Sequence, residues 1–251
     1  VKYILLQGAT GSGKSVMAGE IIRRSVAKEK NVWFVVPRRD LLRQMGEVFN
    51  GFGIEHGYIA AGYDFNPFVS AHIVSLQSMH GRYHKVKCPD LAFIDETHVG
   101  SEQLDNLIKW LKDGGAWIIG LSASPWRLNG RGLGCWYDEM ICGPSIRWLI
   151  DNQRLSDYRA FAPNSPDLSM LKITGGDYEK GALSEVMEQN RVLIGNCVKH
   201  YKTHAMGKLG VTFAVSRKHS ELLAQSYRDN GVPAMHIDGE TPDRDRYEIA
   251  R

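Results

Sequence analysis

The sequence predicts an α/β fold in which helices flank a parallel sheet. Between Val1 and about Ser124, short apolar runs alternate with amphipathic stretches, and a glycine-rich loop follows the first run directly. Near-continuous apolar runs are typical of strands that are buried on both faces, as in parallel sheets covered by helices. Strands that alternate with helices in this way form βαβ units, in which each helix crosses back over the sheet.

Each expected element rests on its own pattern. Five buried strands are expected at Tyr3–Leu6, Val32–Val36, His72–Val74, Leu91–Ile94 and Trp117–Leu121. A helix is expected after Lys14, where small and apolar side chains repeat at helical spacing: Ala18, Ile21, Ile22, Ser25 and Val26. Leu104, Leu107, Ile108 and Leu111 repeat in the same way and predict a helix before the last strand.

The second half of the chain changes character. Residues 125–181 contain many Gly and Pro residues and only one short apolar helix, around Ile146–Ile150. A regular α/β pattern then resumes: a helix at Leu193–Tyr201, a strand at Val211–Val215, a helix at His219–Asp229 ended by Gly231, and a strand at Ala234–Ile237. We therefore expect a first domain over residues 1–145, a connector over 146–190, and the start of a second, similar domain over 191–251.

Composition narrows the class of protein. The chain has 251 residues, of which 43% are hydrophobic and 24% charged, a profile typical of a globular protein. A net charge of +3 does not decide whether the partner is nucleic acid. No apolar run is long enough for a membrane span, and the glycine-rich loop begins too early to leave room for a signal peptide. Membrane association is not expected, and a monomer is favoured although no sequence feature fixes the oligomeric state.

The cysteines favour a reducing compartment. Cys88, Cys135, Cys142 and Cys197 are scattered, without close pairs at metal-ligand spacing. We interpret them as reduced thiols of a cytoplasmic protein, and a zinc site is not expected.

The glycine-rich loop carries the most specific pattern in the chain, G-x-x-x-x-G-K-[ST]. It comprises Gly8, Ala9, Thr10, Gly11, Ser12, Gly13, Lys14 and Ser15. Glycines allow backbone N–H groups to close around phosphate oxygens, and the helix N-terminus that follows adds a partial positive charge. The pattern predicts that Lys14 contacts the β and γ phosphates of a nucleotide and that Ser15 gives its hydroxyl to Mg²⁺. The alternative is a glycine-rich turn with a chance lysine.

Two acids end a strand of the buried type. Asp95 and Glu96 follow Leu91–Ile94, at the carboxyl end of the strand, where open α/β sheets bind ligands. Asp95 is a candidate ligand of Mg²⁺, and Glu96 is a candidate general base that polarises the attacking water. The alternative is a solvated turn, which the phosphate loop makes less favourable.

Several segments resemble superfamily-two DEAD/DEAH-box helicases of the phage and bacterial type, related to repair and restriction translocases. Asp95-Glu96-Thr97-His98 resembles the DEAH box, with Thr97 in place of Ala. Val36–Gln44 resembles motif Ia, Ser75–Met79 motif Ib, Leu121–Pro125 motif III and Phe213–Arg217 motif IV. The resemblance implies a P-loop NTPase with a RecA-like first domain and a partial second RecA-like domain. It further implies ATP and Mg²⁺ as cofactors, with Lys14, Asp95 and Glu96 as catalytic residues of a helicase or translocase.

The same resemblance implies contacts with nucleic acid, DNA being favoured over RNA. The candidate residues are Pro37, Arg38, Arg39, Gln77, Ser78 and Arg217. Arg38 and Arg39 are expected in solvent at the start of a helix, where side chains and N–H groups grip phosphates. The alternative for this arginine pair is an ordinary charged helix start.

Motif III implies coupling between nucleotide state and the second domain. Ser122 and Ser124 follow a buried strand beside the acidic pair, and we expect them to act with His98. A simple turn before Pro125 is the alternative.

The family's upstream glutamine motif and its motifs V and VI are not found in the chain. Without the arginine finger of motif VI, which contributes a factor of about 10³ to 10⁵ in rate, we expect binding of nucleotide with weak hydrolysis. Two other functions stay open: a P-loop switch without a nucleic-acid groove, and a nucleic-acid-binding module that uses ATP only as a conformational ligand.

Overall fold

The chain forms two compact units, Val1–Tyr158 and Arg159–Arg251, which we describe separately. The computed structural model describes residues 1–79, 81–127, 130–161, 169, 171–174, 177–189 and 191–249. Parts of the expected connector, such as residues 162–168, lie outside the described residues, and the assignment of 146–190 to a connector stays a prediction. The division between the units falls inside that stretch.

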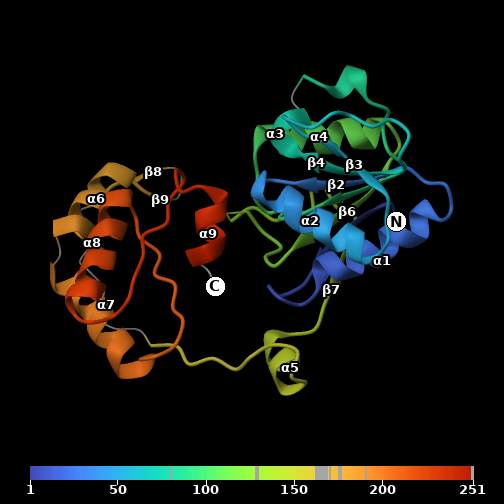
Figure 1. The fold of residues 1–251 in the computed structure, drawn as a ribbon. Coiled ribbons are helices and arrows are strands. Elements are labelled where there is room, and N and C mark those ends of the chain that lie inside the picture. Colours follow the sequence, from blue (N-terminus) through green and yellow to red (C-terminus); the bar gives the residue numbers. More distant parts are fainter. Residues whose placement is uncertain are drawn as a thin grey trace. The chain divides into compact units, whose positions relative to one another are not determined.

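A seven-stranded parallel sheet forms the centre of the first unit (Figure 1). The strands are β1 (Tyr3–Gln7), β2 (Val32–Val36), β3 (His56–Ile59), β4 (Ala71–Ser75), β5 (Leu91–Ile94), β6 (Trp117–Ser122) and β7 (Glu139–Cys142). Their order is β3-β4-β2-β5-β6-β1-β7, and all neighbouring strands run parallel. The five predicted strands are all present, which confirms the predicted α/β class.

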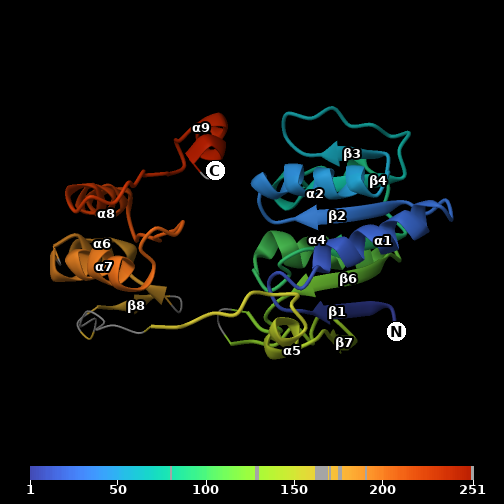
Figure 2. The same cartoon turned by 60° about the horizontal axis from the view of Figure 1, so that its bottom comes forward.

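Helices cover both faces of this sheet (Figure 2). The helical segments are α1 (Lys14–Val26), α2 (Asp40–Gly51), α3 (Leu76–Met79), the 3-10 helix η1 (Tyr83–Lys85), α4 (Glu102–Asp113) and α5 (Ile146–Asp151). The apolar stripes predicted for α1 and α4 place their buried side chains against opposite faces, in two separate core clusters. One cluster combines α1 and α2 with Phe34 and Phe93, and the other combines α3 and α4 with Ile94 and Ile118.

Two strands have no counterpart in the sequence-based prediction. In β3 only every second residue is buried, and the strand begins with His56 and Gly57, which break an apolar run. All four residues of β7 are exposed, because this strand lies at the edge of the sheet beside β1. Both strands are therefore held by backbone pairing more than by burial, and apolar runs do not reveal them.

The second unit is mainly helical in its described part. It contains a two-stranded antiparallel ribbon, β8 (Ile173–Thr174) and β9 (Asp177–Tyr178), and the helices α6 (Lys180–Gln189), α7 (Arg191–His204), α8 (Arg217–Asp229) and α9 (Asp243–Ile249). Its core cluster consists of Val198, Tyr227 and Val232, with three partly buried neighbours.

The two strands expected in this unit are not formed, and that prediction is wrong. Residues 211–215 and 234–237 pair with no strand in the described part of the chain. Phe213 is 93% exposed and Met235 is 68% exposed. A β-strand needs a neighbour to satisfy its backbone groups, so an apolar run without one stays irregular. The partial second RecA-like domain therefore stays a prediction.

The described residues contain no helix that could span a membrane, no disulfide and no cluster of metal ligands. Every helix in these ranges is too short or too polar to cross a bilayer. The four cysteines are free thiols, and no described group of three or more His, Cys, Asp or Glu side chains has the arrangement of a metal site.

Candidate functional site

The phosphate loop connects the carboxyl end of β1 with the first turn of α1. Gly11 and Gly13 have φ values of +77° and +85°, in the left-handed region that favours glycine. A Cβ atom on Gly8 would lie 2.9 Å from the Ser12 hydroxyl, so a side chain there would disturb the loop. The Gly8 N–H donates to the Ser122 carbonyl over 2.9 Å, which ties the loop to the end of β6.

Two polar groups inside this loop fit a bound phosphate. The Lys14 ammonium donates to the Gly8 and Ala9 carbonyls, at 2.9 and 3.1 Å, so its charge is held over the loop. The Ser12 hydroxyl is buried and has no hydrogen-bond partner among the described residues. A buried polar group without a partner is costly, and a phosphate oxygen would supply one. The loop is thus suited to a nucleotide phosphate.

An acidic turn follows β5 at the same edge of the sheet. The Asp95 N–H donates to the Val35 carbonyl of β2, and the Thr97 N–H donates to the Leu121 carbonyl of β6. Between these two anchors, Glu96 adopts a φ of +47°, which is a strained conformation for a residue with a side chain. The Glu96 N–H donates to the Asp95 carboxylate over 3.0 Å. The strand end thus presents two carboxyl groups in a fixed turn.

The environment of Asp95 suits a cation. Burial raises the pKa of the Asp95 carboxyl, repulsion by Glu96 raises it further, and the Lys14 charge acts in the opposite direction. Lys14 therefore lies close enough to act on the Asp95 carboxyl, so the phosphate loop and the acidic turn are neighbours at this edge of the sheet. A divalent cation would relieve the cost of ionising Asp95, and its preference for oxygen ligands fits Asp95 and Ser15.

A hydrogen-bonded chain links the acidic turn with the end of β6. The Ser122 hydroxyl donates to the Ser124 carbonyl at 2.6 Å, and it accepts the Ser124 N–H at 3.0 Å. His98 Nδ1 lies 2.9 Å from the same hydroxyl and 3.3 Å from Glu96 Oε2. Because the Ser122 hydrogen is directed at Ser124, we assign the proton to His98 Nδ1. The structure thus brings together all three residues predicted to couple the site.

The candidate nucleic-acid residues of motifs Ia and Ib meet at one backbone position. Arg39 Nη2 donates to the Ala61 carbonyl at 2.9 Å, and the Ser78 hydroxyl accepts the Ala61 N–H at 3.0 Å. Pro37 ends β2 as predicted, and Arg38 is exposed beside Arg39 just before α2. Gln77 is exposed in α3. No sequence pattern indicates the role of Ala61, because only its backbone takes part in these hydrogen bonds.

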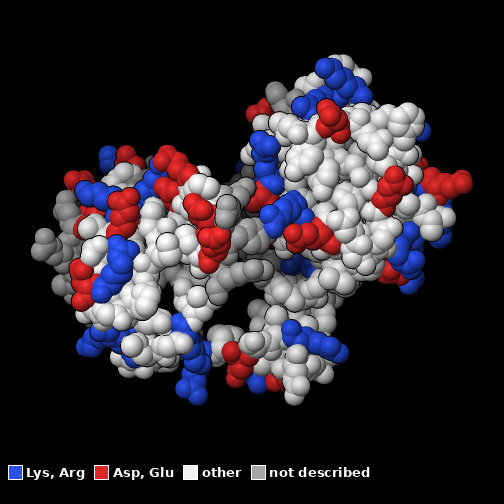
Figure 3. All heavy atoms as spheres, viewed as in Figure 1, with Lys and Arg blue, Asp and Glu red and all other residues white. Residues whose placement is uncertain are grey.

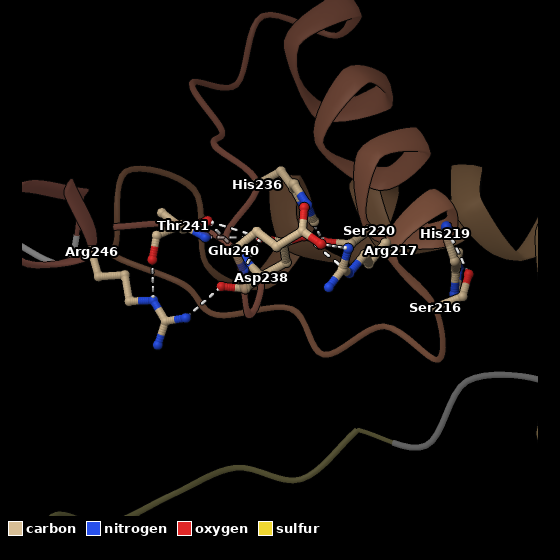
Figure 4. A network of polar contacts seen from close by, with 9 residues as sticks. All are labelled: Ser216, Arg217, His219, Ser220, His236, Asp238, Glu240, Thr241 and Arg246. Atoms are coloured by element: carbon tan, nitrogen blue, oxygen red, sulfur yellow. Dashed lines mark hydrogen bonds and ion pairs between the residues drawn. The ribbon is translucent and has the colours of Figure 1, made fainter. Parts of the chain in front are cut away.

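Arg217 lies in the second unit, in a polar network at the start of α8 (Figure 4). Its guanidinium forms ion pairs with Asp238 and Glu240. Arg246 donates to the Asp238 and Thr241 carbonyls in the same network. Arg217 is therefore already paired with acids, which the sequence-based prediction of a phosphate contact did not foresee.

The surface charge is mixed. On the face shown in Figure 3, Lys and Arg lie among Asp and Glu on both units. No single-sign region dominates this face, so attraction of nucleic acid would depend on particular side chains more than on net charge.

Tyr137 is the buried residue near the site that sequence reasoning missed. Its hydroxyl lies 2.6 Å from Thr97 Oγ1, and its side chain is 6% exposed. The available signal was the hydroxyl of Thr97 where the resembling box has Ala, because a buried hydroxyl requires a partner.

Comparison with known proteins supports the sequence resemblance. The family described as "Type III restriction enzyme, res subunit" matches residues 2–127, which are 126 of the 251 residues. A "51.5 kDa protein" of Lactococcus phage (isolate 7-9) is 29% identical over 246 residues, covering 98% of this chain and 51% of that protein. The "Putative ATP-dependent helicase IRC3" of Saccharomyces cerevisiae is 28% identical over 272 residues, covering 99% of this chain and 39% of that protein.

The UvsW helicase from bacteriophage T4 matches with a TM-score of 0.46 and 16% identity, over 57% of this chain and 55% of that one. The chain spans about half the length of the phage relative and less of the yeast relative. The family match confirms the resemblance to superfamily-two helicases that the motifs suggested. The chain therefore belongs to the helicase-related family described as "Type III restriction enzyme, res subunit".

Proposed function

We propose that this chain is the nucleotide-binding part of an ATP-dependent motor that moves along or unwinds nucleic acid. The observation that carries the proposal is the meeting of the loop Gly8–Ser15 with the acids Asp95 and Glu96 at one edge of the sheet. The Lys14 charge acts on the Asp95 carboxyl, as expected when loop and acids serve one nucleotide. ATP is the nucleotide we favour, because the name of the yeast relative includes it.

The side chains divide the work of hydrolysis between them. The loop N–H groups and Lys14 would hold the phosphates, and Ser15 and Asp95 would hold Mg²⁺, which neutralises phosphate charge when bound. The Glu96 side chain is 40% exposed, so water reaches its carboxylate, which would accept a proton from the attacking water. His98, through Ser122 and Ser124, would transmit the state of Glu96 to the end of β6.

The nucleic-acid contact is proposed for the residues just before α2 and for α3. Arg39 and Ser78 hold the Ala61 backbone, whereas Arg38 is exposed beside them. We therefore assign the main phosphate contact to Arg38, with Gln77 as a neutral donor and with Arg39 and Pro37 shaping the surface. We favour DNA over RNA on the resemblance to repair and restriction translocases. Arg217 would join only after release from Asp238 and Glu240.

The test of the catalytic assignment is Glu96→Gln. We expect ATP hydrolysis to fall by at least about 10²-fold, the scale of a general base, while calorimetry shows nucleotide affinity within about twofold of wild type. Glu29→Gln is the matched control, because Glu29 is an exposed glutamate that also has a left-handed φ, of 58°. The control should hydrolyse ATP at the wild-type rate.

Three results would contradict parts of this proposal. Equal turnover by Glu96→Gln and wild type would exclude Glu96 as the base. A wild-type chain that binds no ATP would refute the nucleotide site. Hydrolysis that neither single-stranded DNA nor RNA stimulates would favour a P-loop switch over a motor.

A further inference from the structure

Thr97 and Tyr137 form a buried hydroxyl pair beneath the acidic turn. Thr97 is 1% exposed and Tyr137 is 6% exposed, and their hydroxyl oxygens are 2.6 Å apart. The two residues are 40 positions apart in the sequence, one just after β5 and the other just before β7. Such a pair satisfies both buried hydroxyls at once, and removing one partner leaves the other without a hydrogen bond.

The surrounding backbone is shaped to bring the phenol to Thr97. A Cβ atom on Gly120 of β6 would overlap the Tyr137 ring and hydroxyl, so this glycine opens the path across the sheet face. The Tyr137 N–H donates to the Leu133 carbonyl, and the next residue, Asp138, donates its N–H to the Tyr3 carbonyl at the start of β1. Burial raises the pKa of the Tyr137 phenol, so the hydroxyl keeps its hydrogen at neutral pH.

The pair adjoins the strained residue of the site. Glu96, directly before Thr97, has a φ of +47°, and a conformation of this kind persists only where its surroundings enforce it. Backbone hydrogen bonds fix Asp95 to β2 and Thr97 to β6. The Tyr137 hydroxyl adds a side-chain hydrogen bond to Thr97, and its ring belongs to the core cluster that contains Ile94 and Ile118.

We infer that the Thr97–Tyr137 hydrogen bond locks the acidic turn, holding Glu96 in its left-handed conformation and His98 against Ser122. Both members of the pair are positioning residues, because they act through Glu96 and not on the nucleotide. This inference rests on the proposed function for its kinetic consequence. Its structural part, the position of His98, is independent of hydrolysis.

The test is a double-mutant cycle of Tyr137→Phe, Thr97→Val and the double variant, all in the full chain. Each single variant leaves one buried hydroxyl unpaired, so we expect a lower Tm and a kcat about tenfold lower, with KM nearly unchanged. The double variant removes both hydroxyls, so its Tm should return toward wild type. Its kcat should stay about tenfold low, because the lock is still absent.

The cycle separates positioning from mere stability. Recovery of both Tm and kcat in the double variant would overturn the inference, since a purely structural pair loses nothing once both hydroxyls are gone. Thr97→Ser keeps the hydroxyl and should retain kcat. Tyr83→Phe is the matched control, because Tyr83 packs against the same core cluster and its ring contacts Trp110.

The second readout does not require hydrolysis. In ¹H–¹⁵N spectra, the ring signals of His98, assigned with His98→Gln, should shift in Tyr137→Phe and in Thr97→Val but not in Tyr83→Phe. Unchanged His98 signals would overturn the lock even if kcat falls. Shifted signals in a chain that binds no ATP would support the lock while refuting the proposed function.

Discussion

The ionised carboxylate of Asp95 lowers the stability of the folded chain. Burial is the main cause that raises the pKa of its carboxyl, and the neighbouring Glu96 adds to it. The pKa in the folded state thus lies above the unfolded value. Ionised Asp95 therefore lowers stability at high pH, and this loss disappears as pH falls through the raised pKa.

Asp95→Asn should consequently raise the Tm of the nucleotide-free chain at neutral and alkaline pH. The asparagine carbonyl still accepts the Glu96 N–H that Asp95 accepts at 3.0 Å, so the turn keeps that contact. Thermal melts from pH 8 down to pH 4 should show the difference from wild type shrinking as pH falls. Asp64→Asn, at an exposed loop carboxyl, is the control and should show no such trend. A variant less stable than wild type at pH 8 would mean that ionised Asp95 is stabilising.

Single residues of the site were predictable where a short pattern defines them. The phosphate loop, Asp95 and Glu96 could be named because spacing along the chain fixes their geometry. Tyr137 and Ala61 could not be named in this way. The first joins Thr97 from 40 positions away, and the second acts through its backbone, which has no residue type to recognise.

Among the secondary-structure elements, buried strands were predictable and edge or unpaired strands were not. β2 and β4 are buried at all five positions, so their apolar runs stand out. β7 is exposed throughout and gives no such signal. Residues 211–215 also form an apolar run, but they pair with no strand in the described part of the chain, and they remain irregular. A local pattern reports the tendency to be buried, whereas strand formation depends on a pairing partner elsewhere in the chain.

Arg38 and Arg39 lie at the junction between β2 and α2, and we expect them to contribute differently to nucleic-acid affinity and to stability. Arg38→Ala should lower the slope of log affinity against log salt for single-stranded DNA by about 0.7, the value for one lost phosphate contact. Its Tm should stay at the wild-type value, because the exposed Arg38 side chain forms no hydrogen bond or ion pair with the residues that the structure describes. Fluorescence anisotropy at several salt concentrations measures the slope.

Arg39→Ala should behave differently, because its guanidinium binds the Ala61 carbonyl after β3. We expect a loss of about 0.5–1.5 kcal/mol in stability and a smaller change of salt slope than for Arg38→Ala. Arg43→Ala, one turn further along α2 and ion-paired with Glu47, is the control for loss of a positive charge. Equal salt slopes for Arg38→Ala, Arg43→Ala and wild type would show that neither Arg38 nor the start of α2 contacts nucleic acid.

For the molecule as a whole, the two units differ in how much core they possess. The two large core clusters lie entirely within Val1–Tyr158, and they extend over both faces of the sheet. The cluster of the second unit has only three buried members in the described residues. Stability grows with buried apolar area, so the first unit should be much the more stable of the two.

We therefore predict that residues 1–158 fold alone and retain nucleotide binding, since the loop and the acidic turn lie within them. Calorimetry of the full chain should show two transitions, with the higher one at the Tm of the isolated 1–158 piece within about 4 °C. Hydrogen exchange should be faster in α7 and α8 than in β2 and β5. One cooperative transition shared by both units, or an unfolded 1–158 piece, would contradict this prediction.

At position 96, the residue types that best suit the left-handed backbone differ from the one that the proposed base requires. Glycine adopts such a φ without strain and asparagine adopts it more readily than glutamate, yet neither carries a carboxylate that can accept a proton. Variants selected only for expression or heat resistance should accumulate glycine or asparagine at position 96, whereas selection for turnover should keep glutamate. A stabilising programme applied blindly to this chain would thus tend to remove its proposed base first.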